Sequence, residues 1–287
     1  MIGSALVEYL TGRGCDVRRL VRSGASGSDC LWDPRRGQIE LANAGSIDAV
    51  VHLAGENIAS GRWTKARKAR ISASRVEGTA LLAGSLAGLP HRPKLLISAS
   101  AVGYYGHCGD QIVDETHPRG QGFLAQVAGD WEAAAFPVTE AGVRVVFLRL
   151  GMVLSNSGGA LGRMVGPFSW CAGGVVGSGR QYISWVSLDD VLGIVGKIMD
   201  DPEISGPVNA ASPQAVTNRE FTKTLGRVLN RPTFARMPAF AARLLFGQMA
   251  DELLLRGVRA APRVLVDAGY QFQHPQLEEA LRVILHR

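Results

Sequence analysis

The first residues of the chain show two hydrophobic patterns, one helical and one extended. Residues 2–10 carry apolar side chains at helical spacing, and Gly12 and Gly14 follow them as helix-ending residues. Residues 16–21 then have the pattern of a short strand. Because a helix followed directly by a strand is half of a βαβ unit, the pattern indicates the second part of such a unit.

Continuous apolar runs alternate with helical patterns along the first half of the chain. Such runs are typical of strands buried on both faces, and their alternation with helices indicates a parallel sheet covered on both sides. We therefore predict an α/β fold with a Rossmann-type, doubly wound parallel sheet. Strands are expected at 16–21, 48–54, 94–100 and 143–151, and helices at 66–88 and 123–136.

The sequence changes character after about residue 155, where Gly-rich stretches such as SNSGGALGRM and CAGGVVGSGRQ are typical of loops. We predict a Rossmann domain at 1–155 and a smaller mixed C-terminal lobe with a C-terminal extension at 156–287. Some segments of the second part are expected to return to the first. Helical patterns occur at 189–199, 218–229, 240–255 and 275–285.

Composition narrows the possible partners. The 287 residues are 46% hydrophobic and 20% charged with a net charge of +6, which suits a globular protein with an anionic small ligand. No uninterrupted apolar run reaches the roughly 18 residues of a membrane span, so no membrane partner is expected. The four scattered cysteines indicate reduced thiols in a cytoplasmic protein. Neither they nor the histidines have metal-ligand spacing, so no metal is expected.

The opening helix has only the end of the turn that normally precedes it. In a doubly wound nucleotide-binding fold, a first strand enters this helix through a Gly-rich turn that approaches a pyrophosphate. Gly3 fits the last glycine of that turn, while the strand and the other glycines are absent. We expect the natural protein to begin roughly ten residues earlier; the alternative is that a helix simply opens the chain. A missing strand predicts either a break or a closing-up of the sheet between strands 16–21 and 48–54.

The end of strand 16–21 bears on the choice of dinucleotide. An acidic side chain there would bind the adenosine ribose of NAD, whereas a basic one accommodates the 2′-phosphate of NADP. The run LVRS places Arg22 at this end with no acid beside it. This favours NADP, and the alternative is a solvated surface arginine.

Several longer motifs resemble the extended short-chain dehydrogenase/reductases. The stretches VVHLAGENI, ISASAVGYYG, GDWEAAA, GSGRQYISWVSLDDV, GPVNAASPQAVTNREF and ADELLLRG occur in the order of that family. More closely, the chain resembles an atypical, NAD-dependent epimerase/dehydratase-like branch called epimerase family proteins, which shares the C-terminal extension ending AGYQFQHPQLEEAL. The resemblance covers nearly the whole chain and implies an NADP-binding Rossmann domain with a smaller C-terminal substrate lobe.

The resemblance also implies which residues contact the cofactor. Val21 and Arg22 match the position that contacts the adenosine end of the cofactor, and Leu53 and Ala54 match the turn that lies along it. Arg75 matches a cofactor-contacting position on the following helix, and Val153 matches the region near the nicotinamide. Arg75 lies in the basic run GRWTKARKARISASR, most of whose charges fit a solvated helix face. Few aromatic residues interleave with this run, so nucleic-acid binding is not expected.

The catalytic positions implied by the resemblance are only partly filled. Ordinary members use Ser or Thr and then Tyr-x-x-x-Lys, in which the tyrosine is the general acid/base and the lysine lowers its pKa. Ser98 and Ser100 stand at the carboxyl end of strand 94–100. Where tyrosine and lysine are expected, the chain has Phe123 and Val127, so the usual proton relay is absent if this register is right.

Three interpretations of the chemistry remain open. Another residue near Ser100 supplies the proton, with Tyr104 and Tyr105 as candidates; water supplies it; or the protein binds NADP(H) and catalyses nothing. The alternative for both tyrosines is packing over the loop that follows the strand. We predict an NADP(H)-dependent oxidoreductase acting on an unknown small molecule, and the other possibility is a non-catalytic NADP(H)-binding regulator or sensor. No oligomeric state is predicted.

Other polar residues have two interpretations each. Arg180 fits a contact for a carboxylate or phosphate; the alternative for its segment is that Trp185 packs in the core and Asp190 caps the helix starting at Val191. Asn209 fits either a turn residue or a cleft donor. Asp130, Trp131 and Glu132 form a possible site-facing trio. The favoured interpretation is that Trp131 packs while the two acids cap or pair on the helix surface.

Overall fold

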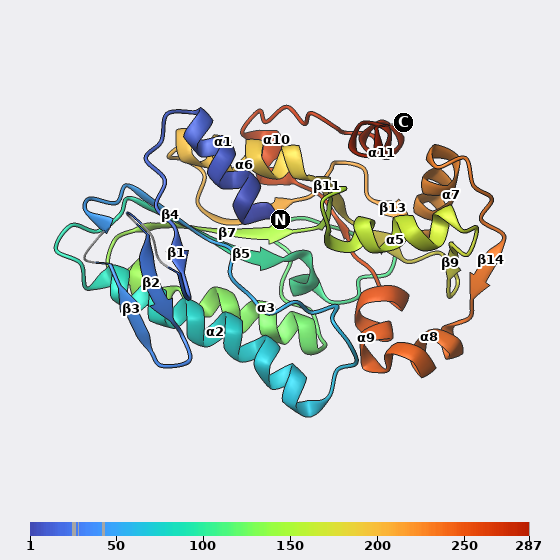
Figure 1. The fold of residues 1–287 in the computed structure, drawn as a ribbon, viewed down its shortest axis with the longest axis horizontal. Coiled ribbons are helices and arrows are strands. Elements are labelled where there is room, and N and C mark those ends of the chain that lie inside the picture. The colour runs from blue at the N-terminus through green and yellow to red at the C-terminus, as the bar shows by residue number, and fades with distance from the viewer. Residues whose placement is uncertain (25–26, 28, 42–43, 287) are drawn as a thin grey trace.

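A four-stranded parallel sheet forms the centre of the computed structural model, which describes residues 1–24, 27, 29–41 and 44–286 (Figure 1). The strands are β4 (Ala49–His52), β5 (Leu95–Ala101), β7 (Arg144–Leu150) and β12 (Gly206–Ala210). Their order is β12-β7-β5-β4, and each pairs in parallel with its neighbour. The predicted α/β fold with a parallel sheet is confirmed.

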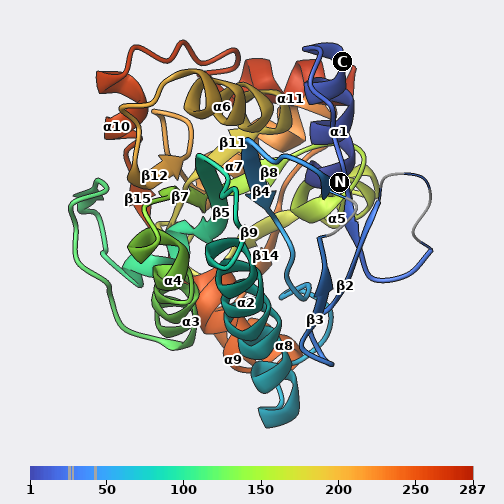
Figure 2. The same cartoon turned by 90° about the vertical axis from the view of Figure 1, so that its left-hand side faces the viewer.

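Helices cover both faces of this sheet (Figure 2). On one side lie α1 (Ile2–Gly12), α6 (Leu188–Asp200) and α10 (Arg263–Asp267), and on the other lie α2 (Lys65–Ala87), α3 (Phe123–Ala133) and α4 (Phe136–Glu140). Val146 and Leu148 of β7 join the core on the α1 and α6 side, while Val145 joins the core under α2 and α4. Since β7 is buried on both faces, residues 145–148 form a continuous apolar run rather than an alternating one.

A separate three-stranded sheet lies beside the central one. It consists of β1 (Leu20–Val21), β2 (Cys30–Asp33) and β3 (Gln38–Glu40). Within the described residues, β1 pairs with β2 and β4 pairs only with β5. Of the two expected outcomes between β1 and β4, a break and a closing-up of the sheet, the structure has the break. The strand predicted at 16–21 is present only at its last two residues. The β2–β3 hairpin, with Trp32 opposite Ile39, was not predicted.

The remaining strands form short pairs, three parallel and one antiparallel. The parallel pairs are β8 (Met152–Leu154) with β11 (Trp185–Ser187), β9 (Gly174–Val176) with β14 (Ala235–Met237), and β6 (Ile112–Val113) with β15 (Arg259–Ala260); the antiparallel pair is β10 (Tyr182–Ile183) with β13 (Val216–Thr217). Helices α5 (Gly159–Ser169), α7 (Asn218–Val228) and α11 (Leu277–Leu285) enclose a second apolar core with Trp185 and Phe221.

The long helix predicted at 240–255 is broken. It forms α8 (Ala239–Phe246), a three-residue helix α9 (Gln248–Ala250) and a π-helical turn, Asp251–Leu255. The break falls at Gly247, whose φ of 60° is incompatible with a right-handed helix and needs a glycine. Among the described helices, none has the length and apolar character needed to cross a membrane.

A buried polar chain ties β4 to α2 and α3. Trp131 Nε1 donates a hydrogen bond to Thr79 Oγ1 at 2.8 Å, and Thr79 Oγ1 lies 3.0 Å from His52 Nε2. Burial lowers the pKa of His52 to about 4, so the ring is neutral at pH 7. In the neutral tautomer protonated at Nδ1, the ring accepts the Thr79 hydroxyl proton at Nε2, and the hydroxyl oxygen accepts from the indole.

His52 makes the stability of the fold sensitive to mild acid. An unfolded histidine has a pKa near 6.5, so between that value and about 4 the unfolded chain binds the extra proton. The free energy of unfolding therefore falls as the pH falls, by about 2 kcal/mol from this residue between pH 7 and pH 5. Urea unfolding at both pH values should show a weaker pH dependence for His52→Gln than for the wild type. The same pH dependence in both proteins would contradict this assignment.

Candidate functional site

Three polar residues lie in one row across the central sheet. The strand register sets Ser100 of β5 and Asn209 of β12 on either side of Arg149 of β7. All three are buried, with at most 3% of each residue exposed. They stand near the carboxyl ends of parallel strands, which is the edge where open α/β sheets bind ligands.

Glu132 of α3 neutralises Arg149. The Arg149 Nε and Nη2 atoms donate to the two carboxylate oxygens at 2.8 and 2.9 Å, and Ser100 Oγ donates to Oε1 at 2.6 Å. Burial alone would lower the pKa of Arg149, but the hydrogen bonds and charge of Glu132 outweigh it and raise that pKa. The expectation that Glu132 caps or pairs on the helix surface is therefore wrong, because its partners are buried in the sheet.

Tyr105 extends the same network. It ends a short 3₁₀ helix, Val102–Tyr105, and its hydroxyl accepts from Arg149 Nη1 at 2.9 Å and donates to Asn209 Oδ1 at 2.7 Å. The Asn209 backbone N–H in turn donates to Glu115 Oε1 at 3.0 Å. Burial raises the pKa of Tyr105 to about 12, so the phenol keeps its proton at neutral pH. Asn209 is thus a buried link in this network rather than a turn residue.

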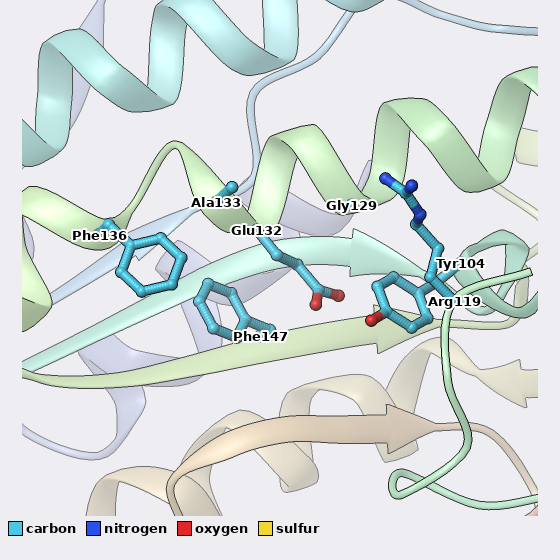
Figure 3. Close-up of a pocket in the computed structure, with 7 residues that line it drawn as sticks. All are labelled: Tyr104, Arg119, Gly129, Glu132, Ala133, Phe136 and Phe147. Carbon is cyan, nitrogen blue, oxygen red and sulfur yellow. The ribbon is translucent and has the colours of Figure 1, made fainter.

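A cavity of about 320 Å³ lies beside this network (Figure 3). The Tyr104 ring stacks on Arg149, whose guanidinium carbon is 3.6 Å from the ring centroid. Figure 3 shows the Glu132 carboxylate drawn between the rings of Tyr104 and Phe147. Within the described part of the chain, the Tyr104 hydroxyl makes no hydrogen bond, unlike those of Ser100 and Tyr105. The residues lining the cavity are Tyr104, Arg119, Gly129, Glu132, Ala133, Phe136 and Phe147.

The first half of α3 lies in an apolar cluster. Val127 is buried there with Trp63 and Met249, and the Phe123 ring meets Trp63 edge-on at 5.2 Å. Glu252 closes the start of this helix, because its carboxylate accepts the backbone N–H groups of Phe123 and Leu124 at 3.2 and 3.3 Å. Met249 in the apolar cluster and Glu252 at the helix start therefore both bring the C-terminal part of the chain into contact with α3.

Phe123 faces away from Ser100. Glu132, which contacts Ser100, comes nine residues later, and nine helical residues place two side chains on opposite sides of a helix. That Phe123 and Val127 occupy the family's tyrosine and lysine positions stays a prediction.

Arg75 lies against the turn that follows β4. Its Nη1 donates to the backbone oxygens of Glu56 and Ile71 at 3.1 Å each, and its guanidinium lies 5.0 Å from the Trp131 ring centroid. A Cβ at Gly55 would be only 3.2 Å from the guanidinium carbon, so a larger residue there would crowd the Arg75 side chain. Burial lowers the pKa of Arg75 to about 10, which leaves it charged at neutral pH. The half-buried Leu53 and Ala54 lead directly into this turn.

The other predicted cofactor residues lie at β1 and around the start of α1. The half-buried Val21 ends β1, and Arg22 follows it as an exposed side chain on a small cavity of about 110 Å³. A Cβ at Gly3, in the first turn of α1, would meet nothing within 4 Å. A Cβ at Gly159 would lie 3.4 Å from Met1 Cε and 3.6 Å from the Val153 oxygen, so β8 passes close to the same helix end. Among the described residues, no group of three or more His, Cys, Asp or Glu side chains could hold a metal ion.

Arg149 and Glu252 are the residues of this region that sequence reasoning missed. Arg149 had a readable signal, because a charge within an otherwise apolar strand must be paired when the strand is buried. Glu252 had none, since its partners are backbone N–H groups about 130 residues away in sequence.

The comparisons with known proteins agree with this architecture. A family model described as the NAD dependent epimerase/dehydratase family matches residues 1–211. The chain belongs to this family. A second model, a domain of unknown function called DUF1731, matches residues 237–284, the segment that holds α8 and the Glu252 cap. The predicted family and its C-terminal extension are both confirmed.

Members of the family are similar along nearly the whole chain. An epimerase family protein of Mycobacterium bovis is 45% identical over 98% of this chain and 93% of its own length. A crystal structure of human epimerase family protein SDR39U1 with NADPH has a TM-score of 0.91 at 34% identity, covering 100% of this chain and 96% of that one. A UDP-glucose 4-epimerase of Thermotoga maritima, 17% identical with a TM-score of 0.77 over 100% of this chain and 94% of that one, shares the fold.

Replacing Glu132 should destabilise the protein strongly. Glu132→Gln leaves the Arg149 charge buried without a counterion, and breaking a buried pair in this way costs about 3–5 kcal/mol. Urea unfolding measures the loss. The control is Glu278→Gln, whose partners Arg227 and Arg282 lie on the surface, and no resolvable change is expected there. Equal stability of Glu132→Gln and the wild type would show that the buried pair does not hold the site together.

Proposed function

We propose that this chain is an NADP(H)-dependent oxidoreductase of the extended short-chain dehydrogenase/reductase type that acts on a small molecule. The observation that carries the proposal is Arg75, a half-buried cation held against the turn after β4. The human relative, 34% identical along the whole chain and solved with NADPH, supports the choice of cofactor. The family match supports the class of protein.

The residues present suit a dinucleotide phosphate. Arg22 and Arg75 are both arginines, whose planar guanidinium groups are well matched to phosphate oxygens. We assign Arg22 to the 2′-phosphate, Leu53 and Ala54 to the length of the cofactor, and Val153 to the nicotinamide end. Bound NADP(H) would supply or accept the hydride. The chain's own part is to hold the dinucleotide and to provide a proton.

Tyr104 is the proposed proton donor. The hydroxyls of Ser100 and Tyr105 are already engaged with Glu132 and Asn209. Tyr104 lines a cavity of about 320 Å³, which is within the range of small-molecule sites. Ser100 acts in this proposal as a positioning residue through Glu132.

A non-catalytic NADP(H) sensor is the second candidate, and one observation favours it. Phe123 and Val127, which we assign to the family's tyrosine and lysine positions, lie in an apolar cluster with Met249 and Leu253 from the C-terminal segment. A site filled with hydrocarbon provides no proton relay. Such a site would still allow a bound dinucleotide to change the packing of the C-terminal segment, and that change would be the signal of a sensor.

The proposed setting is the cytoplasm, with a small molecule and no nucleic acid as partner. All four cysteines, at positions 15, 30, 108 and 171, are free thiols, as expected in a reducing compartment. The net charge of +6 suits anionic small ligands such as the proposed cofactor.

Arg22→Ala should discriminate between the two cofactors. Loss of a charge-assisted contact to the 2′-phosphate should weaken NADPH binding by ~1.5–3 kcal/mol and leave NADH binding nearly unchanged. Calorimetric titration with each cofactor measures both values. Arg35→Ala, which removes an exposed arginine in the turn between β2 and β3, is the matched control. Equal losses of affinity for NADPH and NADH would contradict the assignment of Arg22 to the 2′-phosphate.

Tyr104→Phe tests the catalytic proposal. With NADPH and a panel of carbonyl compounds, removal of the proton donor should lower kcat by roughly 10²–10⁴-fold without changing NADPH affinity. Tyr182→Phe, on β10 away from the cavity, should keep full activity. Unchanged turnover in Tyr104→Phe would point to water or another group. NADPH binding by the wild type without any turnover would favour the sensor.

A further inference from the structure

Five large apolar side chains are exposed between residues 170 and 245. Trp170 and Phe234 are 85% and 90% exposed, Phe240 and Leu244 are each 72% exposed, and Leu245 is 55% exposed. We call these five residues, together with Arg231, Arg236 and Arg243, the aromatic–basic face. Exposed apolar groups of this size on neighbouring elements are typical of interaction surfaces.

The fold brings these residues to one end of the molecule. Trp170 follows α5 and precedes β9, while Phe234 precedes β14, and the parallel pairing sets Gly174 opposite Ala235. Arg231 Nε donates to the Ser169 oxygen at 3.0 Å, which ties the segment before β14 to the end of α5. Figure 1 shows β9, β14 and α8 together at its right-hand end.

The segment from residue 221 to residue 250, which contains most of the aromatic–basic face, has basic but no acidic residues. Residues 221–250 contain no Asp or Glu but contain five basic side chains: Lys223, Arg227, Arg231, Arg236 and Arg243. Two of these are paired, Arg243 with Asp251 at 2.9 Å and Arg227 with Glu278. Within the described residues, Arg236, which lies between Phe234 and Phe240, makes no ion pair and is exposed. Charge and apolar groups therefore alternate along an exposed stretch.

We propose that the aromatic–basic face docks peripherally on an anionic phospholipid bilayer. Tryptophan and phenylalanine are suited to the boundary between head groups and acyl chains, and interleaved arginines suit lipid phosphates. A second copy of this face would bring like charges together, which disfavours self-association through it. The sequence-based expectation of no membrane partner rested on spanning runs, and a surface contact of this kind needs none.

The chain contains its own reporter for this contact. Of its five tryptophans, only Trp170 is exposed, since the other four are at most 8% exposed. Burial of Trp170 in a bilayer should therefore shift the fluorescence emission to the blue, and Trp170→Phe should abolish the shift. The shift reports on this face alone.

Sedimentation of the full chain with vesicles tests the proposal. We expect binding to phosphatidylcholine vesicles with 30% phosphatidylglycerol and much weaker binding to pure phosphatidylcholine. The double variant Phe240→Ser/Leu244→Ser should lose binding, and Arg236→Ala should weaken it about fivefold. Ile112→Ser, which changes an exposed residue on β6, should bind like the wild type.

Three results would overturn the proposal. The first is no association with either type of vesicle. The second is association that the double variant and Arg236→Ala leave unchanged. The third is a concentration-dependent dimer in light scattering that the double variant abolishes, since the face would then be a protein interface. All substituted side chains are exposed, so each variant should unfold at the wild-type temperature, and thermal unfolding checks this.

Discussion

A single buried charge sets the arrangement of the site. Arg149 stands within a strand that is apolar on both faces, and a guanidinium in such a place must be paired and hydrogen-bonded. Its donors are satisfied by Glu132 from the helix above and Tyr105 from the loop beyond the neighbouring strand. The demand for a complete set of partners therefore fixes the rotation of α3 and the path of the chain after β5 at the same time. Tyr104 is held by the same cation, through its ring rather than its hydroxyl.

Much of this fold follows from the sequence because its signals are local. The strands β5 and β7 are long and mostly apolar, so both were predicted nearly to their ends. The hairpin at 30–40 was missed because its strands are short and its stabilising contacts are made with distant residues. Trp32, for example, packs on Gly78 of α2 and on His52 of β4. The helix predicted at 240–255 failed at Gly247, where apolar periodicity continues across a residue whose backbone leaves the helical region.

Only part of the candidate site could be predicted from the sequence, because local signals are visible there and tertiary contacts are not. Ser100 was predicted from its place at a strand end, a property of neighbours in sequence. The role of Glu132 depends on which side of α3 faces the sheet, and that is decided by Arg149, seventeen residues later. Charge pairing across elements is a tertiary property, so the helix-surface interpretation was reasonable from periodicity alone; it is wrong for Glu132, whereas Asp130 does pair on the helix surface with Gln126.

The carboxylate of Glu252 also has a consequence for how the chain folds. Helix α3 packs on the middle of the sheet, yet the backbone groups that begin it are closed by a side chain 129 residues further along. A helix capped by its own flanking residues can form early, whereas this one is completed only after most of the polypeptide has been synthesised and has closed a long loop. Until then, the apolar side chains of the first half of α3 lack the part of their cover that Met249 and Leu253 provide. The C-terminal segment thus acts late in folding, as the element that seals the centre of the molecule.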